Sequence, residues 1–189
     1  MIWKDVGMWH IEHINYLYHG TDARFNNISL DKAKAFKDFG KGFYLTSIPE
    51  QAVEWARSRG DQHRNDQVFV YKYRVNTAWM TDEFAIKECR LYSEEWLELI
   101  YRCRMGVFDP PYDIIYDRMA DGRINETLEK YRQDKLSALG ALQDLTRWRR
   151  KRDQYCFKTE KACALLEREG VISIIRTEDG TWGEWNESE

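Results

Sequence analysis

The chain has 189 residues, which is enough for one substantial domain and argues against two small ones. Hydrophobic residues make up 43% and aromatic residues 14% of it, which argues against a largely disordered chain. The formal net charge of −3 gives no overall attraction to nucleic acid, so binding to a polyanion would have to come from a local cluster.

Short apolar and aromatic runs predict several strands along the chain. The predicted strands span residues 13–19, 42–46, 67–75, 112–121, 155–159 and 171–177. The segment "QVFVYKYRV" is the clearest of them, because apolar and polar residues alternate through it. The strands are short and lack long runs of Val and Ile, which favours an α+β fold over a doubly wound parallel sheet.

Helical patterns lie between these strands. A helical turn is predicted within residues 29–40, and helices are predicted over 47–60, 93–105, 123–152 and 159–170. We expect Ser47, Ser93 and Thr159 to begin three of these helices. We expect Gly40, Gly60 and Gly170 to end helical segments, and Gly140 to break the long one.

Targeting signals are missing from the sequence. The first twenty residues are interrupted by charge and glycine, and no stretch reaches the roughly 20 apolar residues that a membrane helix needs. The four cysteines form no CxxC pair, which indicates reduced thiols. We therefore expect a cytoplasmic protein with no signal peptide and no membrane contact.

Several familiar catalytic and binding motifs are absent. No GxGxxG follows a strand and no GxxxxGK[ST] occurs, which excludes the usual dinucleotide and phosphate loops. His10 and His13 could share a helical face but have no clear third ligand, so we expect no metal site. No GxSxG sequence is present, and no cysteine lies in a nucleophile context.

Three segments carry a resemblance to a known superfamily. The segments "YHGT" (18–21), "DFGKGFYLT" (38–46) and "QAVEWA" (51–56) resemble the first signature elements of the ADP-ribosyltransferases. In particular they resemble a bacterial family of domains of unknown function. Segments 95–100, 112–121 and 154–166 follow in that family's order, so the resemblance covers about residues 16–166. The central motif is specific, whereas "YHGT" alone would be weak.

The resemblance implies a fold, a co-substrate and site residues. It implies a split, mostly antiparallel pair of small sheets that binds NAD, with His19, Tyr44 and Gln154 as catalytic residues. His19 would bind a ribose, and Tyr44 would stack on the nicotinamide ring. The implied NAD-binding residues are His19, Gly20, Thr21, Phe39, Gly40, Gly42 and Tyr44. Without the resemblance, His19 would be an ordinary strand-end histidine and Tyr44 a core residue.

The third catalytic position departs from the usual pattern. Active members of the superfamily usually have glutamate where this chain has Gln154, and an amide stabilises positive charge less well than a carboxylate. Asp121 and Glu160 are nearby carboxylates that could compensate. Glu160 has a simpler interpretation, because an acidic residue is favourable in the first turn of a helix.

A basic cluster precedes Gln154. We expect it to contact the target through Arg147, Trp148, Arg149, Arg150 and Arg152. The alternative is a helix C-terminus whose cations complement the helix dipole.

Together these patterns predict a single, toxin-like ADP-ribosyltransferase domain over residues 1–189. It would bind NAD, release nicotinamide and transfer ADP-ribose to a macromolecular acceptor, either protein or nucleic acid. An antitoxin or immunity protein could restrain it. The alternative is a noncatalytic regulatory module that binds NAD or nucleic acid.

Overall fold

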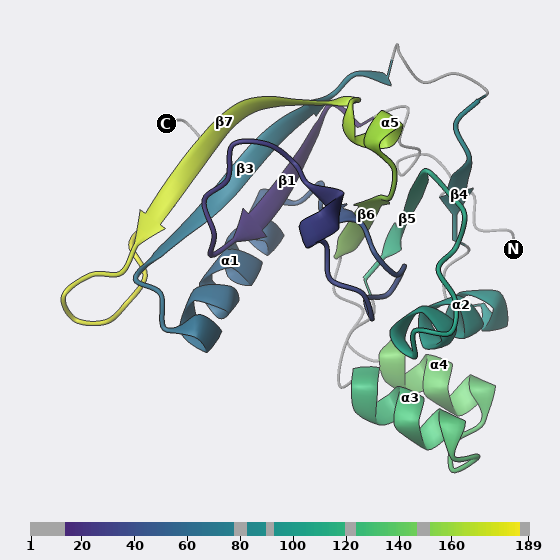
Figure 1. Cartoon of the computed structure of the whole chain (residues 1–189). Helices are drawn as coiled ribbons and strands as arrows, with labels where there is room; N and C mark the ends of the chain where they lie inside the picture. Colours follow the sequence, from purple (N-terminus) through teal and green to yellow (C-terminus); the bar gives the residue numbers. More distant parts are fainter. Residues whose placement is uncertain (1–13, 78–82, 90–92, 120–123, 147–151, 186–189) are drawn as a thin grey trace, which may run out of the picture. The chain divides into compact units, whose positions relative to one another are not determined.

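The computed structural model describes residues 14–77, 83–89, 93–119, 124–146 and 152–185 (Figure 1). These residues form an α+β structure with two small, mostly antiparallel sheets, which confirms the predicted fold class. The chain divides into two compact units. The first comprises Met1–Ile28, Tyr44–Glu83 and Glu160–Glu189, and the second comprises Ser29–Phe43 and Phe84–Thr159. The expectation of a single domain over residues 1–189 stays a prediction.

The first unit contains a three-stranded antiparallel sheet. Its strands are β1 (Tyr16–Thr21), β3 (Gln67–Val75) and β7 (Leu166–Ile175), in the order β1-β3-β7. Helix α1 (Pro49–His63) contacts β1 and β3, and the one-turn helix α5 (Glu160–Cys163) precedes β7 (Figure 1). A buried cluster joins α1 to the sheet and contains Tyr18, Ala52, Val53, Ala56, Val68, Val70 and Ile174.

The second sheet has four strands, and the last three of them in chain order belong to the second unit. Its order is β2-β6-β5-β4, formed by β2 (Phe43–Leu45), β6 (Asp153–Phe157), β5 (Ile114–Arg118) and β4 (Ile86–Glu88). All five residues of β6 are buried, and β4 runs parallel to β5. The helical elements of this unit are η2 (Leu30–Lys32), α2 (Glu94–Arg104), α3 (Ile124–Arg132) and α4 (Ala138–Leu145).

The capping predictions had mixed outcomes. Ser93 caps α2 as expected, since its hydroxyl oxygen accepts a hydrogen bond from the amide of Trp96 at 3.1 Å. Ser47 does not cap α1, because the helix begins after Ile48, whose amide donates to the hydroxyl of Thr46. Thr159 donates a hydrogen bond to Oδ1 of Asp113 at 2.7 Å, and its expected role at the start of the following helix stays a prediction.

The prediction of a helix over residues 159–170 is wrong beyond its first turn. The chain enters β7 at Leu166 and pairs with the whole length of β3, from Val75 opposite Leu166 to Gln67 opposite Ile175. Gly170 lies inside this strand and ends no helix. The apolar spacing of "ACALL" suits a helix locally, but pairing with a distant strand overrides that weak local preference.

Gly60 does not end α1 as predicted. The helix continues to His63 and ends at Arg64, which adopts the left-handed conformation. A Cβ atom on Gly60 would lie 2.6 Å from the ring of Trp182 and 2.7 Å from Val68. Glycine is therefore needed here because a tryptophan packs directly on the helix backbone.

The predicted long helix over residues 123–152 is two helices within the described residues. The chain turns between Arg132 and Ser137, where Asp134 has a φ of 54°. Ser137 begins α4 by accepting a hydrogen bond from the amide of Gly140, at 3.2 Å. The predicted break near Gly140 is therefore present, but it lies a few residues earlier, at 133–137, and Gly140 itself lies inside α4.

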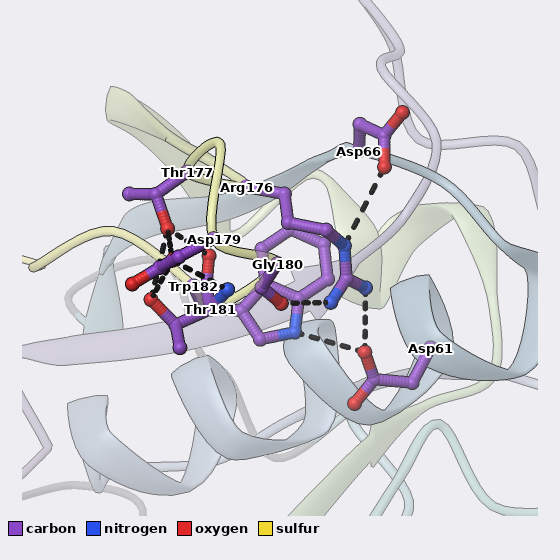
Figure 2. A network of polar contacts seen from close by, with 8 residues as sticks. All are labelled: Asp61, Asp66, Arg176, Thr177, Asp179, Gly180, Thr181 and Trp182. Atoms are coloured by element: carbon purple, nitrogen blue, oxygen red, sulfur yellow. Dashed lines mark hydrogen bonds and ion pairs between the residues drawn. The ribbon is translucent and has the colours of Figure 1, made fainter.

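The segment after β7 is fixed to α1 by one arginine (Figure 2). The guanidinium of Arg176 lies 4.0 Å from the ring centroid of Trp182 and donates to Oδ1 of Asp61 at 2.6 Å. It also donates to the carbonyl oxygen of Gly180 at 2.9 Å. The indole nitrogen of Trp182 donates to the same Oδ1 atom at 3.0 Å, which completes the network.

All four cysteines, Cys89, Cys103, Cys156 and Cys163, are buried and outside any disulfide, as the sequence predicted. Burial raises the pKa of the Cys89 and Cys163 thiols to about 12 and that of Cys103 to about 11, so these three are protonated at neutral pH. Among the described helices, none has the length and apolar character needed to cross a bilayer.

Candidate functional site

The two motifs that carry the resemblance are joined by hydrogen bonds in the first unit. The backbone amide of Tyr18 donates to the carbonyl oxygen of Thr46 at 2.8 Å. In return, the amide of Thr46 donates to the carbonyl oxygen of Tyr18 at 2.9 Å. "YHGT" and the end of "FYLT" therefore lie side by side, although they are more than twenty residues apart in the sequence.

His19 makes a second connection between these motifs. Its Nδ1 atom lies 2.7 Å from the carbonyl oxygen of Tyr44. A carbonyl only accepts, so Nδ1 carries the hydrogen, and in the neutral ring Nε2 is an acceptor. Burial lowers the pKa of His19 to about 4 and outweighs the opposing effect of this hydrogen bond. The ring is therefore neutral at pH 7.

Aromatic residues surround the His19 ring. Phe25 meets it edge-on, with ring centroids 5.7 Å apart, and the Tyr71 centroid is 6.5 Å away. Phe25 also stacks on Tyr71 at 4.1 Å, and the Tyr71 hydroxyl accepts from the amide of Phe25 and donates to its carbonyl oxygen. Arg168 adds a hydrogen bond to the carbonyl oxygen of Asn26 at 2.9 Å. The loop that follows β1 is thus fixed against the sheet beside His19.

An acidic residue anchors the start of the same loop. Oδ2 of Asp22 lies 2.5 Å from Nδ1 of His63 and accepts from Asn65 at 3.0 Å. Burial alone would raise the pKa of Asp22, but these contacts and Arg59 lower it overall. Asp22 is therefore a structural anchor between the loop and the end of α1.

The other predicted residues of the first motif have clear local roles. A Cβ atom on Gly20 would lie 1.9 Å from the carbonyl oxygen of Ala52, so glycine allows β1 to pack on α1. The Thr21 hydroxyl accepts from the amide of Ala23 at 3.2 Å. Tyr44 is partly buried, and its predicted stacking role stays a prediction.

Lys158 fixes the turn formed by "FGKG" in the second unit. Its ammonium group donates to the carbonyl oxygens of Phe39 at 2.9 Å and Lys41 at 2.7 Å, and to Asp109 at 2.6 Å. The Lys158 side chain is only 5% exposed. This role of Lys158 was not predicted, although the residue belongs to segment 154–166, which carries part of the resemblance.

Backbone conformation at Gly40 and close packing at Gly42 account for the two glycines of this turn. Gly40 has a φ of 77°, and a Cβ atom there would lie 2.4 Å from Oδ1 of Asp109. A Cβ atom on Gly42 would lie 2.4 Å from the sulfur of Cys156. Phe39 is fully buried. These residues shape the turn, and their predicted contact with NAD stays a prediction.

Gln154 is also buried in the second unit, at 7% exposure, on β6. Its side-chain amide donates to Oδ2 of Asp38 at 2.8 Å. Oδ1 of Asp38 accepts from Nε of Arg104 at 2.6 Å, and Arg104 also donates to Asn125 at 2.7 Å. Asp38 is 4% exposed, so a buried carboxylate stands directly beside the predicted catalytic amide. Asp38, the first residue of the segment "DFGKGFYLT", was not predicted from the sequence as a site residue.

The remaining predicted residues divide into two groups. Asp121, Arg147, Trp148, Arg149 and Arg150 lie outside the described residues. Arg152 is described, and its backbone carbonyl accepts from the amide of Met119 at 3.0 Å. Glu160 is exposed in the first turn of α5. Within the described ranges, no group of three or more His, Cys, Asp or Glu residues could hold a metal ion.

The architecture and the comparison with known families together give the class of the protein. It is an α+β protein whose two small sheets are mostly antiparallel. The family described as "Protein of unknown function (DUF3990)" matches residues 16–167, so the chain belongs to this family. The match includes His19, Tyr44, Asp38 and Gln154. No curated protein and no solved structure matches the chain.

Proposed function

We propose that this protein is an NAD-dependent mono-ADP-ribosyltransferase. The observation that carries the proposal is the direct bonding of its two signature motifs, through the backbone pair Tyr18–Thr46 and the bond from His19 to the Tyr44 carbonyl. These motifs resemble the signature strands that bind NAD in the ADP-ribosyltransferase superfamily. The four thiols outside disulfides suit a reducing cytoplasm, where NAD is available.

The neutral state of His19 supports its proposed role. A neutral ring with hydrogen on Nδ1 offers Nε2 as an acceptor for a ribose hydroxyl. A protonated ring would only donate, and its charge would oppose the positive charge that develops on the ribose. Tyr44 would contribute ring stacking, which is worth about 0.5–1.5 kcal/mol beyond area burial.

The proposed reaction breaks one bond and forms another. The bond between the ribose C1′ atom and the nicotinamide nitrogen breaks, and nicotinamide leaves with the electron pair. A nucleophile of the acceptor then bonds to C1′ and loses its proton to solvent. Gln154 would accept a hydrogen bond from a ribose hydroxyl as positive charge develops, and removing one such group costs about 3 kcal/mol.

The test uses NAD labelled in its adenylate half. The protein is incubated with this NAD and cell extract, and nicotinamide release and macromolecular label are both followed. We expect label that is removed by protease for a protein acceptor or by nuclease for a nucleic acid. Tyr44→Ala should abolish labelling, whereas Tyr16→Ala, which truncates an exposed tyrosine of β1, should retain it. Folded wild-type protein that releases no nicotinamide would contradict the proposal.

The basic segment gives a further test of acceptor binding. Replacing Arg149, Arg150 and Arg152 with glutamine should impair labelling of the acceptor and leave NAD binding unchanged. Equal loss of both would support the alternative of a structural helix end.

A noncatalytic NAD-binding module is the second candidate. It is favoured by the uncharged amide at Gln154, where active members of the superfamily usually have a carboxylate. NAD binding without nicotinamide release, with and without extract, would support this candidate.

A further inference from the structure

We propose that Asp38 is a positioning residue that holds the Gln154 amide in one orientation and makes glutamine, rather than glutamate, the residue this site requires. The consequence for NAD rests on the proposed function. The positioning itself does not, because it follows from the buried contacts of Asp38.

The geometry fixes which way the amide points. A carboxylate only accepts hydrogen bonds, so the NH2 group of Gln154 faces Oδ2 of Asp38. The other oxygen of Asp38 is bound by Arg104, which keeps the carboxylate from turning. The carbonyl oxygen of Gln154 is therefore directed away from Asp38 and is presented as an acceptor. An acceptor is what a ribose hydroxyl would need.

The charges around Gln154 explain why a carboxylate is unsuitable there. Among the described residues, three charged groups lie near this position: Asp38 from the turn before β2, Arg104 from α2, and Asp117, which pairs with Gln154 on β5. Asp38 and Asp117 are both buried, and Arg104 is already bound to Asp38 and Asn125. Glutamate at position 154 would place a second carboxylate within hydrogen-bond distance of Asp38. Two such groups share a proton, because both cannot ionise at close range in a buried site.

Exchanging the two groups provides a specific test. In Asp38→Asn, the new amide keeps its oxygen toward Arg104 and donates to Gln154, so the Gln154 amide has to turn and present NH2 outward. In Asp38→Asn/Gln154→Glu, the amide and the carboxylate trade places. The side-chain amide of Asn at position 38 then donates a hydrogen bond to the carboxylate of Glu at position 154. The other oxygen of that carboxylate is a charged acceptor.

The experiment measures stability against pH for the wild type, the two single variants and the double variant. We expect Gln154→Glu to be destabilised at neutral pH and to regain stability as the pH falls. Its shared proton gives a folded-state pKa above the unfolded value of about 4.3, so stability is present below that value and lost as the pH rises. The double variant should regain the wild-type pH profile.

Gln133→Glu is the matched control. Gln133 also donates to a carboxylate, Oε1 of Glu129 at 2.5 Å, but this pair is exposed, so solvent screens the repulsion. A Gln154→Glu protein with the stability and pH profile of the wild type would overturn the proposal. So would a double variant less stable than both single variants.

Nicotinamide release separates this inference from the proposed function. If the function is right, Asp38→Asn should lower kcat on the order of 10²-fold with a small change in KM, and the double variant should recover the loss. Wild-type release that Asp38→Asn leaves unchanged would reject the positioning role but keep the function. Restored stability in the double variant, with no release or NAD binding by any protein, would reject the function and keep the positioning role.

Discussion

A motif in the sequence identified His19 as a site residue, but the protonation state of its ring could be inferred only from the structure. The motif suggested a hydrogen-bonding role, but only burial and the bond to Tyr44 define a neutral ring with hydrogen on Nδ1. The protonation state follows from the low polarity around the ring, and no sequence pattern reports that property.

The lowered pKa of His19 gives a pH prediction. The pKa falls from 6.5 to about 4, so the folded state binds fewer protons than the unfolded state between these values. The resulting stabilisation is present above pH 6.5 and lost as the pH falls toward 4. NMR titration of the His19 ring should show a midpoint near pH 4, and His19→Gln should lose less stability across this range than the wild type. A midpoint near 6.5 would contradict the lowering of the His19 pKa by its surroundings.

Gly20 gives a prediction that separates packing from ligand binding. Gly20→Ala should destabilise the protein by several kcal/mol, because its Cβ atom would overlap the backbone of α1. Gly170→Ala is the control, since Gly170 lies in the same sheet and a Cβ atom there meets nothing within 4 Å. Urea denaturation of both variants is the measurement. Equal stability of the two would show that β1 does not approach α1 as closely as described.

At the scale of helices and strands, local sequence patterns gave correct predictions where the packing of the folded chain favours the same structure. The alternation in "QVFVYKYRV" predicted β3 with its observed bounds, and Ser93 marked the start of α2. The patterns failed at β7 and Gly60, where distant segments decide the outcome. Strand β4 was not predicted, because three residues carry too little periodicity.

For Gly60→Ala we expect a change in stability opposite to the one that helix propensity alone would give. Alanine is favoured over glycine inside a helix by about 1 kcal/mol, so propensity alone would stabilise Gly60→Ala. We expect destabilisation instead, because the new methyl group would overlap Trp182 and Val68. Ser58→Ala, at an exposed position of the same helix, should be neutral or slightly stabilising. Thermal unfolding measures both, and a stabilised Gly60→Ala would refute the close packing of Trp182.

Lys158 connects β6 to the "FGKG" turn and supports a further prediction. Lys158→Met should cost about 3 kcal/mol, because two backbone carbonyls and Asp109 lose a charged donor. Lys161→Met is the control, since Lys161 is exposed and donates to the carbonyl oxygen of Glu83. Chemical denaturation should show a much larger loss for the first variant. Equal effects would mean that Lys158 contributes no more than a surface lysine.

At the scale of the molecule, the sequence predicted the α+β class, because this class depends on short, specific segments. It did not predict the division into two compact units, which depends on contacts between distant residues. His19 and Tyr44 belong to the first unit and Gln154 to the second. The hydrogen bond between Gln154 and Asp38 was not predicted either, since the two residues are 116 positions apart in the sequence.

The proposed binding of NAD beside His19 and Tyr44 can be measured by calorimetric titration with NAD. We expect saturable binding to the wild type, weakened by about 1–3 kcal/mol in His19→Ala, the cost of a lost buried hydrogen bond. Tyr44→Ala should also bind more weakly while keeping the wild-type circular dichroism. Binding of NAD with unchanged affinity by both folded variants, or no binding by the wild type, would contradict the account.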